Sequence, residues 1–269
     1  MSWLVFVDTN VLLDFYRMGG EGAKRQLEFL DGQKENIILT SQIQMEFLKN
    51  RQTVILDTIG NIKKLDGTVK SFPPLLIEAK PVDVIKTKFS EIEAQQKKIR
   101  KRIERVLLNP SINDQLYQCL QRLFKFEGEY ILSETSDEYS DVVLKAKRRW
   151  MLGFPPRKNG DTSIGDAVNW EWILQCAIKS GSDIIIVSRD KDYGHRHENK
   201  NYVNDWLSAE FRKRVSKKRK LILTEKITDA MTRLEVEVSL DDKTAEENEL
   251  QVLRASPISS SHELSNVFD

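Results

Sequence analysis

Two aspartates follow runs of apolar residues, and they are the residues of this chain best placed to do chemistry. Asp8 comes directly after Trp3-Leu4-Val5-Phe6-Val7, and Asp190 closely follows Ile184-Ile185-Ile186-Val187. Both runs have the composition of a fully buried strand in a parallel sheet. In open α/β sheets, ligands bind in the crevice at the carboxyl ends of the strands. If the two strands are neighbours, both carboxylates lie in one crevice.

Three more acids occupy positions from which they could join this pair. Asp161 and Asp166 frame the start of a helix predicted over 166–179, and Glu46 lies in the helix after a second strand at 36–39. Each acid alone is more simply explained as a cap or turn residue. Several carboxylates together repel one another unless a divalent cation neutralises them. A set of oxygen ligands without Cys or His suits Mg²⁺ or Mn²⁺ and not zinc.

The elements that must position these acids alternate along the chain. Strand-like runs at 3–7, 36–39, 184–187 and 221–223 are each followed by a helix-like segment. Such alternation predicts an α/β fold whose parallel sheet is covered by helices on both faces.

A long helical block interrupts the alternation. Apolar residues at spacings of three and four recur over 53–70 and again over 82–108, where they form a coiled-coil-like seam with Gln96 in one polar slot. The two stripes could pack as a helical hairpin. We therefore divide the chain into a first part of the sheet domain (1–52), a helical insertion (53–152), a second part of the sheet domain (153–238) and a tail (239–269) that is predicted to be disordered.

Composition sets the broad class. With 42 Lys and Arg against 41 Asp and Glu over 269 residues, net charge predicts no partner. The two cysteines, Cys119 and Cys176, are too few for a disulfide scaffold and are expected to be reduced and buried. No apolar run is long enough to span a membrane, and the N-terminus is predicted to be a strand and not a signal peptide. We expect a cytoplasmic protein without membrane contact.

Four motifs resemble those of the PIN-domain nucleases, in particular the larger bacterial PIN-like proteins with a helical insertion. They are Val-Phe-Val-Asp8-Thr9-Asn10-Val-Leu-Leu, Glu46 before Asn50-Arg51, Ile164-Gly165-Asp166-Ala167, and Val187-Ser188-Arg189-Asp190-Lys191-Asp192. The resemblance covers about residues 1–52 and 157–235. The departures are small, since Ser188 stands where Thr is frequent and Tyr193 where another aromatic residue is frequent.

The resemblance implies a three-layer α/β sandwich with a mostly parallel central sheet, and a phosphodiesterase site that depends on Mg²⁺ or Mn²⁺. By position, the metal-binding and catalytic quartet is Asp8, Glu46, Asp166 and Asp190, with Asp161 as a fifth acid. Asn10, Ser188 and Asp192 would support these ligands or bind metal secondarily. Two metal ions would activate a water and stabilise the leaving oxygen. The four carboxylates should then lie within about one metal-bridging distance of each other.

An acidic pocket repels nucleic acid, so cationic residues must surround it. If such a site is present, the residues expected to contact the nucleic-acid backbone are Arg51, Arg148, Arg149, Arg157, Lys158 and Arg189. A solvated helix face is the simpler explanation of the other basic runs.

We expect an endonuclease, with RNA preferred over DNA and a role as a toxin or defence effector, both on the resemblance alone. Three alternatives stay open: a structure-specific DNA nuclease, a catalytically inactive PIN-like module for nucleic-acid binding or assembly, and an Asp-phosphorylated receiver-like domain. The last should carry a Lys at a late strand end and does not need Glu46. The insertion is the expected contact for a second copy of the chain or for a regulatory protein.

Overall fold

The computed structural model describes residues 2–18, 20–63, 75, 79–157, 163–198 and 200–255. The chain forms two compact units, one of residues 1–49 and 119–269 and the other of residues 50–118. The first unit contains the sheet, and α3 (Ser41–Lys63) and α6 (Gln115–Phe124) each cross the boundary between the units.

The sheet of the first unit has five strands, all parallel, in the order β3-β2-β1-β4-β7. The strands are β1 (Trp3–Val7), β2 (Ile37–Thr40), β3 (Ile131–Leu132), β4 (Asp183–Val187) and β7 (Leu221–Thr224). All residues of β1, β2 and β4 are buried, as their unbroken apolar runs predicted. β1 and β4 are neighbours in register from Trp3 opposite Asp183 to Val7 opposite Val187.

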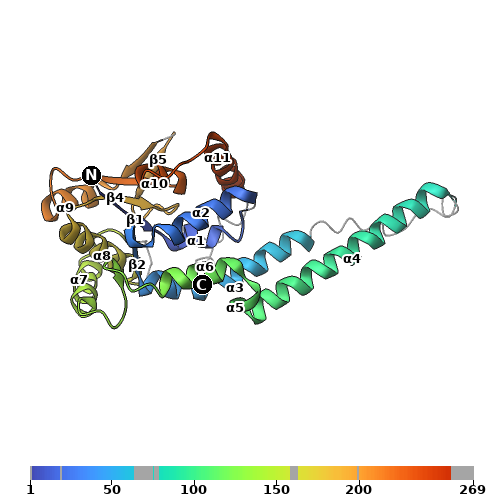
Figure 1. Ribbon diagram of the computed structural model, residues 1–269, viewed down its shortest axis with the longest axis horizontal. Coiled ribbons are helices and arrows are strands. Elements are labelled where there is room, and N and C mark those ends of the chain that lie inside the picture. The colour runs from blue at the N-terminus through green and yellow to red at the C-terminus, as the bar shows by residue number, and fades with distance from the viewer. Residues whose placement is uncertain are drawn as a thin grey trace, which may run out of the picture. The chain divides into compact units, whose positions relative to one another are not determined.

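Helices cover both faces of this sheet, so the predicted three-layer α/β sandwich is confirmed (Figure 1). On one face α8 (Gly165–Ser180) packs against β2 and β4, with α7 (Tyr139–Met151) and α9 (Asp205–Arg214) beside it. The other face carries α1 (Thr9–Asp14), α2 (Gly20–Gly32), α10 (Ile227–Arg233) and α11 (Leu240–Ala255). Trp170 and Trp172 of α8 are fully or almost fully buried, so this helix belongs to the core.

Several helix ends follow the sequence signals. The Thr40 hydroxyl accepts a hydrogen bond from the Ile43 amide at the start of α3, and Asn204 caps α9 by accepting from Trp206 and Leu207. Gly181 ends α8 with φ of 60°, the left-handed conformation that favours glycine. A short 3₁₀ helix, η1 (Lys34–Asn36), leads into β2.

Two strand features escaped the sequence analysis. β3 is only two residues long, and β5 (Gly194–His197) and β6 (Lys200–Val203) form a separate antiparallel hairpin. Both hairpin strands are mostly polar and exposed, so they carry no apolar alternation by which a strand could be recognised.

The expectation of disorder from residue 239 was wrong for Leu240–Ala255, which forms α11. The polar residues of this helix have specific partners: Glu246 accepts from the Ile227 and Thr228 amides, and Asp242 pairs with Arg25. Composition alone indicated a solvated segment, whereas these partners lie far away in sequence. Residues 256–269 lie outside the described residues.

The second unit, residues 50–118, is shorter than the insertion expected at 53–152. The residues after Gln118, including α7, belong to the sheet unit because α7 packs on α8 through buried Val142 and Ala146. The second unit contains α4 (Lys80–Leu108) and α5 (Pro110–Asn113). Most of the second half of the stripe predicted over 53–70 lies outside the described residues.

The predicted seam of α4 divides into a buried and an exposed row. Val82 and Gln96 are buried, whereas Ile85, Ile92 and Ile99 are 38–49% exposed. The predicted helix is present, whereas the packing of its heptad positions as a coiled-coil-like seam stays a prediction.

Both cysteines are free and buried, as expected. Among the residues that the structure describes, no helix is long and apolar enough to cross a membrane.

Candidate active site

Asp8 is held at the carboxyl end of β1 by three neighbouring donors. Its backbone leaves the strand in an extended conformation and caps α1, and its carboxylate accepts from the Thr9 amide at 2.7 Å. The Asn10 side-chain amide and the Ser188 hydroxyl donate to the other oxygen at 2.8 and 2.6 Å. The residue is only 5% exposed. A buried carboxylate with this many donors has one defined orientation.

Asp190 reaches the same place from β4. Because β1 and β4 run in register, the Asp8 amide donates to the Val187 carbonyl at 2.9 Å and brings the two strand ends together. The Asp190 amide then donates to the Ser188 hydroxyl, the group that donates to Asp8. The Asp190 backbone therefore contacts the same hydroxyl as the Asp8 carboxylate, and the negative charge of Asp190 is close enough to raise the pKa of Asp8.

Glu46 approaches Asp8 from α3. The Thr9 hydroxyl donates to one Glu46 oxygen at 3.0 Å, and Gln42, one helical turn earlier, donates to the other at 2.7 Å. Thr9 thus contacts both acids, because its amide donates to Asp8. Sequence reasoning missed Thr9 and Gln42, although the i, i+4 spacing of Gln42 and Glu46 was a readable signal.

Asp166 lies in the first turn of α8, and the start of that helix touches Glu46. A Cβ atom on Gly165 would come within 2.7 Å of a Glu46 carboxylate oxygen and 2.5 Å of the Gln42 amide nitrogen. A side chain at position 165 would therefore push the ends of the Gln42 and Glu46 side chains away from the start of α8. This contact places the start of α8, which carries Asp166, next to the part of α3 that carries Glu46.

The electrostatics of the site are those of crowded carboxylates. Burial, together with the negative charges of Asp190 and Glu46, raises the pKa of Asp8 to about 7, although the Ser188 hydrogen bond opposes the shift. Tyr193, fully buried nearby, has its pKa raised well above its usual value by burial, and then by Asp8, Asp166, Asp192 and Glu46. This electrostatic pattern favours a cation at the site.

The acids converge less tightly than expected. Across the described part of the chain, no three His, Cys, Asp or Glu side chains lie close enough together to hold a metal ion. The expectation that all four carboxylates lie within one metal-bridging distance is therefore not met by the side-chain positions. The oxygens of Asp8 and Glu46 instead accept hydrogen bonds from protein donors.

The acidic side chains at the site nevertheless suit a hard divalent cation. Their ligand atoms are carboxylate oxygens, and the ionised form of Asp8, whose pKa is raised to about 7, is disfavoured until a positive charge is supplied. Asp192 is partly exposed beside Tyr193. Asp161 and Lys158 lie outside the described residues.

Three of the six cations expected to contact nucleic acid form ion pairs inside the protein. Arg51 and Asp114 form an ion pair within the second unit, with side chains 4% and 5% exposed. Arg149 is buried between Glu171 and Glu210, and the Arg189 guanidinium pairs with Asp14 at 2.5 Å. The sequence does not show which basic residues will pair with an acid that is distant along the chain, so these internal ion pairs could not be predicted.

Two of the remaining cations are exposed. Arg148 lies beside Arg149 on α7 but faces solvent. Arg157 lies over the Trp150 ring, with its guanidinium carbon 5.1 Å from the ring centroid. They stay available for phosphate contact.

Compared with protein-family models, the chain matches the one described as PIN domain over residues 5–193. Compared with curated proteins and with solved structures, it has no match. The matched span includes the last three residues of β1, all of α3, the start of α8 and the loop after β4, and so it covers all four acids.

Proposed function

The chain belongs to the PIN-domain family, a nuclease-type fold, and we propose that it is a divalent-metal-dependent endonuclease that cleaves RNA. The proposal is carried by one observation, the chain of contacts that links the acids. The Ser188 hydroxyl donates to the Asp8 carboxylate and accepts from the Asp190 backbone amide. Thr9 donates to both Asp8 and Glu46, and Glu46 lies beside Gly165 at the start of the helix that bears Asp166.

Asp8, Glu46, Asp166 and Asp190 would hold Mg²⁺ or Mn²⁺, with two ions in the favoured arrangement. Such ions supply charge neutralisation at the scissile phosphate and activation of a water. Glu46 would reach a bound cation by giving up the hydrogen bonds that it accepts from the Thr9 hydroxyl and Gln42. Ser188 and Asn10 hold the Asp8 carboxylate in place at the strand end.

The phosphodiester backbone needs positive charge beside this acidic site. Arg148 and Arg157 are exposed, and we assign them to phosphate contacts. The preference for RNA over DNA, and a role as a toxin or defence effector, follow the family resemblance and are part of the same proposal.

Cleavage of one labelled sequence, prepared as single-stranded RNA and as DNA, tests the proposal. RNA should be cut in Mn²⁺ or Mg²⁺ and left intact in EDTA. Asp8→Asn and Asp190→Asn should each lower the rate at least a hundredfold, whereas the control Asp241→Asn, at an exposed position in the first turn of α11, should leave it unchanged.

The alternatives give different results. Faster cutting of DNA than of RNA would replace the substrate assignment. Metal-dependent cleavage that survives both substitutions would remove the assignment of the acids. Binding of RNA without cleavage in either metal would favour an inactive PIN-like module.

A further inference from the structure

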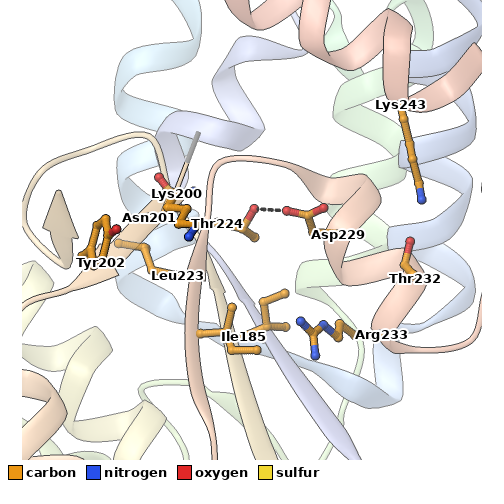
Figure 2. Close-up of a pocket in the computed structure, with 11 residues that line it drawn as sticks. Ile185, Lys200, Asn201, Tyr202, Leu223, Thr224, Asp229, Thr232, Arg233 and Lys243 are labelled. Carbon is orange, nitrogen blue, oxygen red and sulfur yellow. Dashed lines mark hydrogen bonds between the residues drawn. The ribbon is translucent and has the colours of Figure 1, made fainter. Parts of the chain in front are cut away.

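A second concave site lies at the β7 edge of the sheet, apart from the acids. Its cavity has a volume of about 420 Å³. The walls come from β4, β6, β7, α10 and α11 (Figure 2). The volume is within the range of about 300–1,000 Å³ typical of small-molecule sites.

Three cations surround this cavity, each from a different element. They are Lys200 of β6, Arg233 of α10 and Lys243 of α11. Within the described residues none of the three has a carboxylate partner, whereas Arg25, Arg122 and Arg254 on the same unit all form ion pairs. None of the three forms an ion pair with the acid that lines the cavity, so an anion bound there would meet positive charge from three sides.

The one acid that lines the cavity does not neutralise the cations directly. Asp229 accepts a hydrogen bond from the Thr224 hydroxyl at 2.5 Å, and Figure 2 shows this contact on the cavity wall. The positive charges therefore outnumber the negative one, three to one, among the lining residues.

The rest of the lining is suited to a planar organic group. Tyr202 presents a half-exposed aromatic ring, and Ile222 and Leu223 supply apolar surface. Asn201 and Thr232 offer hydrogen-bonding groups at the same site. Phosphate matches the cations, because Arg binds its oxygens in a fork and Lys acts as a point charge. A base or ribose matches the ring and the polar side chains.

We propose that this cavity binds a phosphate-bearing nucleotide. The site is distinct from the acidic centre and does not depend on the nuclease proposal, because its lining contains none of the four acids. It is connected to that centre through the sheet, since the Thr224 carbonyl accepts from the amide of Ser188, whose hydroxyl donates to Asp8.

Calorimetric titration of the full chain with AMP, pyrophosphate and adenosine in EDTA tests this proposal. EDTA removes metal-mediated phosphate binding, so the acids cannot produce the signal. We expect saturable binding of AMP and pyrophosphate and at least tenfold weaker binding of adenosine. Lys200→Gln and Lys243→Gln should each weaken AMP binding at least fivefold, because both lysines are exposed at the cavity and neither is needed for packing.

Two controls keep the result interpretable. Lys213→Gln changes an exposed lysine of α9 and should leave AMP binding unchanged, as should Asp8→Asn. Thermal unfolding of each variant verifies that the fold is retained. Absence of AMP and pyrophosphate binding, or equal binding by all variants, would overturn the proposal.

A 12-nucleotide single-stranded RNA distinguishes the two sources of the phosphate. If the cavity takes a nucleotide of a bound strand, the affinity for this RNA falls in the Lys200 and Lys243 variants. If it takes a free nucleotide, the affinity for RNA is unchanged while AMP binding falls. RNA cleavage by the wild type fails or succeeds independently of either result.

Discussion

Burial and two negative neighbours make the charge of Asp8 costly, and the hydrogen bonds that it accepts offset this cost only in part. With a pKa of about 7, the folded protein holds the proton of Asp8 until about pH 7, whereas an unfolded chain releases it near pH 3.8. Between these values the folded state binds more protons than the unfolded state, so this residue lowers stability as pH rises through the interval.

The resulting prediction concerns the metal-free protein. Its free energy of unfolding should fall between about pH 4 and pH 7 by on the order of a few kcal/mol relative to Asp8→Asn. Urea unfolding in EDTA at several pH values measures both proteins. Adding Mg²⁺ at pH 7 should restore stability to the wild type more than to Asp8→Asn. Parallel pH curves for the two proteins would contradict the assignment.

Ser188 supports a second prediction at the scale of one residue. Its hydroxyl donates to Asp8 at 2.6 Å and accepts from the Asp190 amide, so Ser188→Ala loosens both acids. We expect a loss of about 1–2 kcal/mol of transition-state stabilisation, or roughly 5- to 30-fold in kcat/KM. RNA cleavage kinetics measure it, with Ser188→Thr expected to retain most of the activity. An unimpaired Ala variant would remove this positioning role.

At the scale of elements, α7, α8 and α9 are joined by buried charges. Arg149 of α7 donates to Glu171 of α8 and to Glu210 of α9, and Arg214 closes the network on the same two acids. The network fixes α8, the helix whose first turn carries Asp166.

The adjacent residues Arg148 and Arg149 form a matched pair for testing this. Arg149→Gln should cost about 3–5 kcal/mol of unfolding free energy, because it leaves buried carboxylates undercompensated. Arg148→Gln, at an exposed position, should change stability by less than about 0.5 kcal/mol. Urea unfolding separates the two. Similar costs for both would contradict the buried network.

Glu246 provides the corresponding contact between α10 and α11. It accepts from the Ile227 and Thr228 amides and the Thr228 hydroxyl, donors at the start of α10. Burial raises the pKa of Glu246, although the Thr228 hydrogen bonds oppose the shift. This carboxylate of α11 thus satisfies the first amides of another helix.

Glu246→Ala should therefore lower the free energy of unfolding by about 2–3 kcal/mol, since it leaves buried amides without an acceptor. Urea unfolding measures this loss of stability, and the dependence of the free energy of unfolding on urea concentration should stay the same. Asn248→Ala, at an exposed position on the same helix, is the control. Equal midpoints for the two variants would mean that α11 contributes little to stability.

The elements that sequence predicted well are those with local signals. The runs of β1 and β4, the caps at Thr40 and Asn204 and the stop at Gly181 each depend on residues close in sequence. The failures are long-range: Arg51 meets Asp114 and Arg189 meets Asp14, pairings that no local pattern encodes. For the acids, the sequence predicted the helices and strands that carry them. It did not predict their hydrogen-bond partners, which determine the side-chain positions.

At the scale of the whole molecule, near-zero net charge means that attraction to nucleic acid depends on a few exposed cations. With Arg51, Arg149 and Arg189 in internal pairs, Arg148 and Arg157 are the described members of the predicted set left for phosphate. Each should contribute about one ion to the salt dependence of binding.

Binding of single-stranded RNA by an Asp8→Asn background, measured over a series of NaCl concentrations, tests this. Arg148→Gln or Arg157→Gln should each reduce the slope of log K against log salt by about 0.7. Lys97→Gln, on the exposed surface of α4, serves as the comparison. An unchanged slope in both arginine variants would place the RNA elsewhere.

The central position of β1 has a consequence for synthesis of the protein. β1 is translated well before its neighbour β4, which begins at Asp183, and Asp8 receives its Ser188 hydrogen bond from a residue 180 positions later. At about 5–20 residues per second, that interval lasts roughly 10–40 s. Nascent chains and fragments that end before Ser188 therefore lack the part of the site that follows β4, so under the proposed function translation yields no active nuclease until β4 and Asp190 have been made.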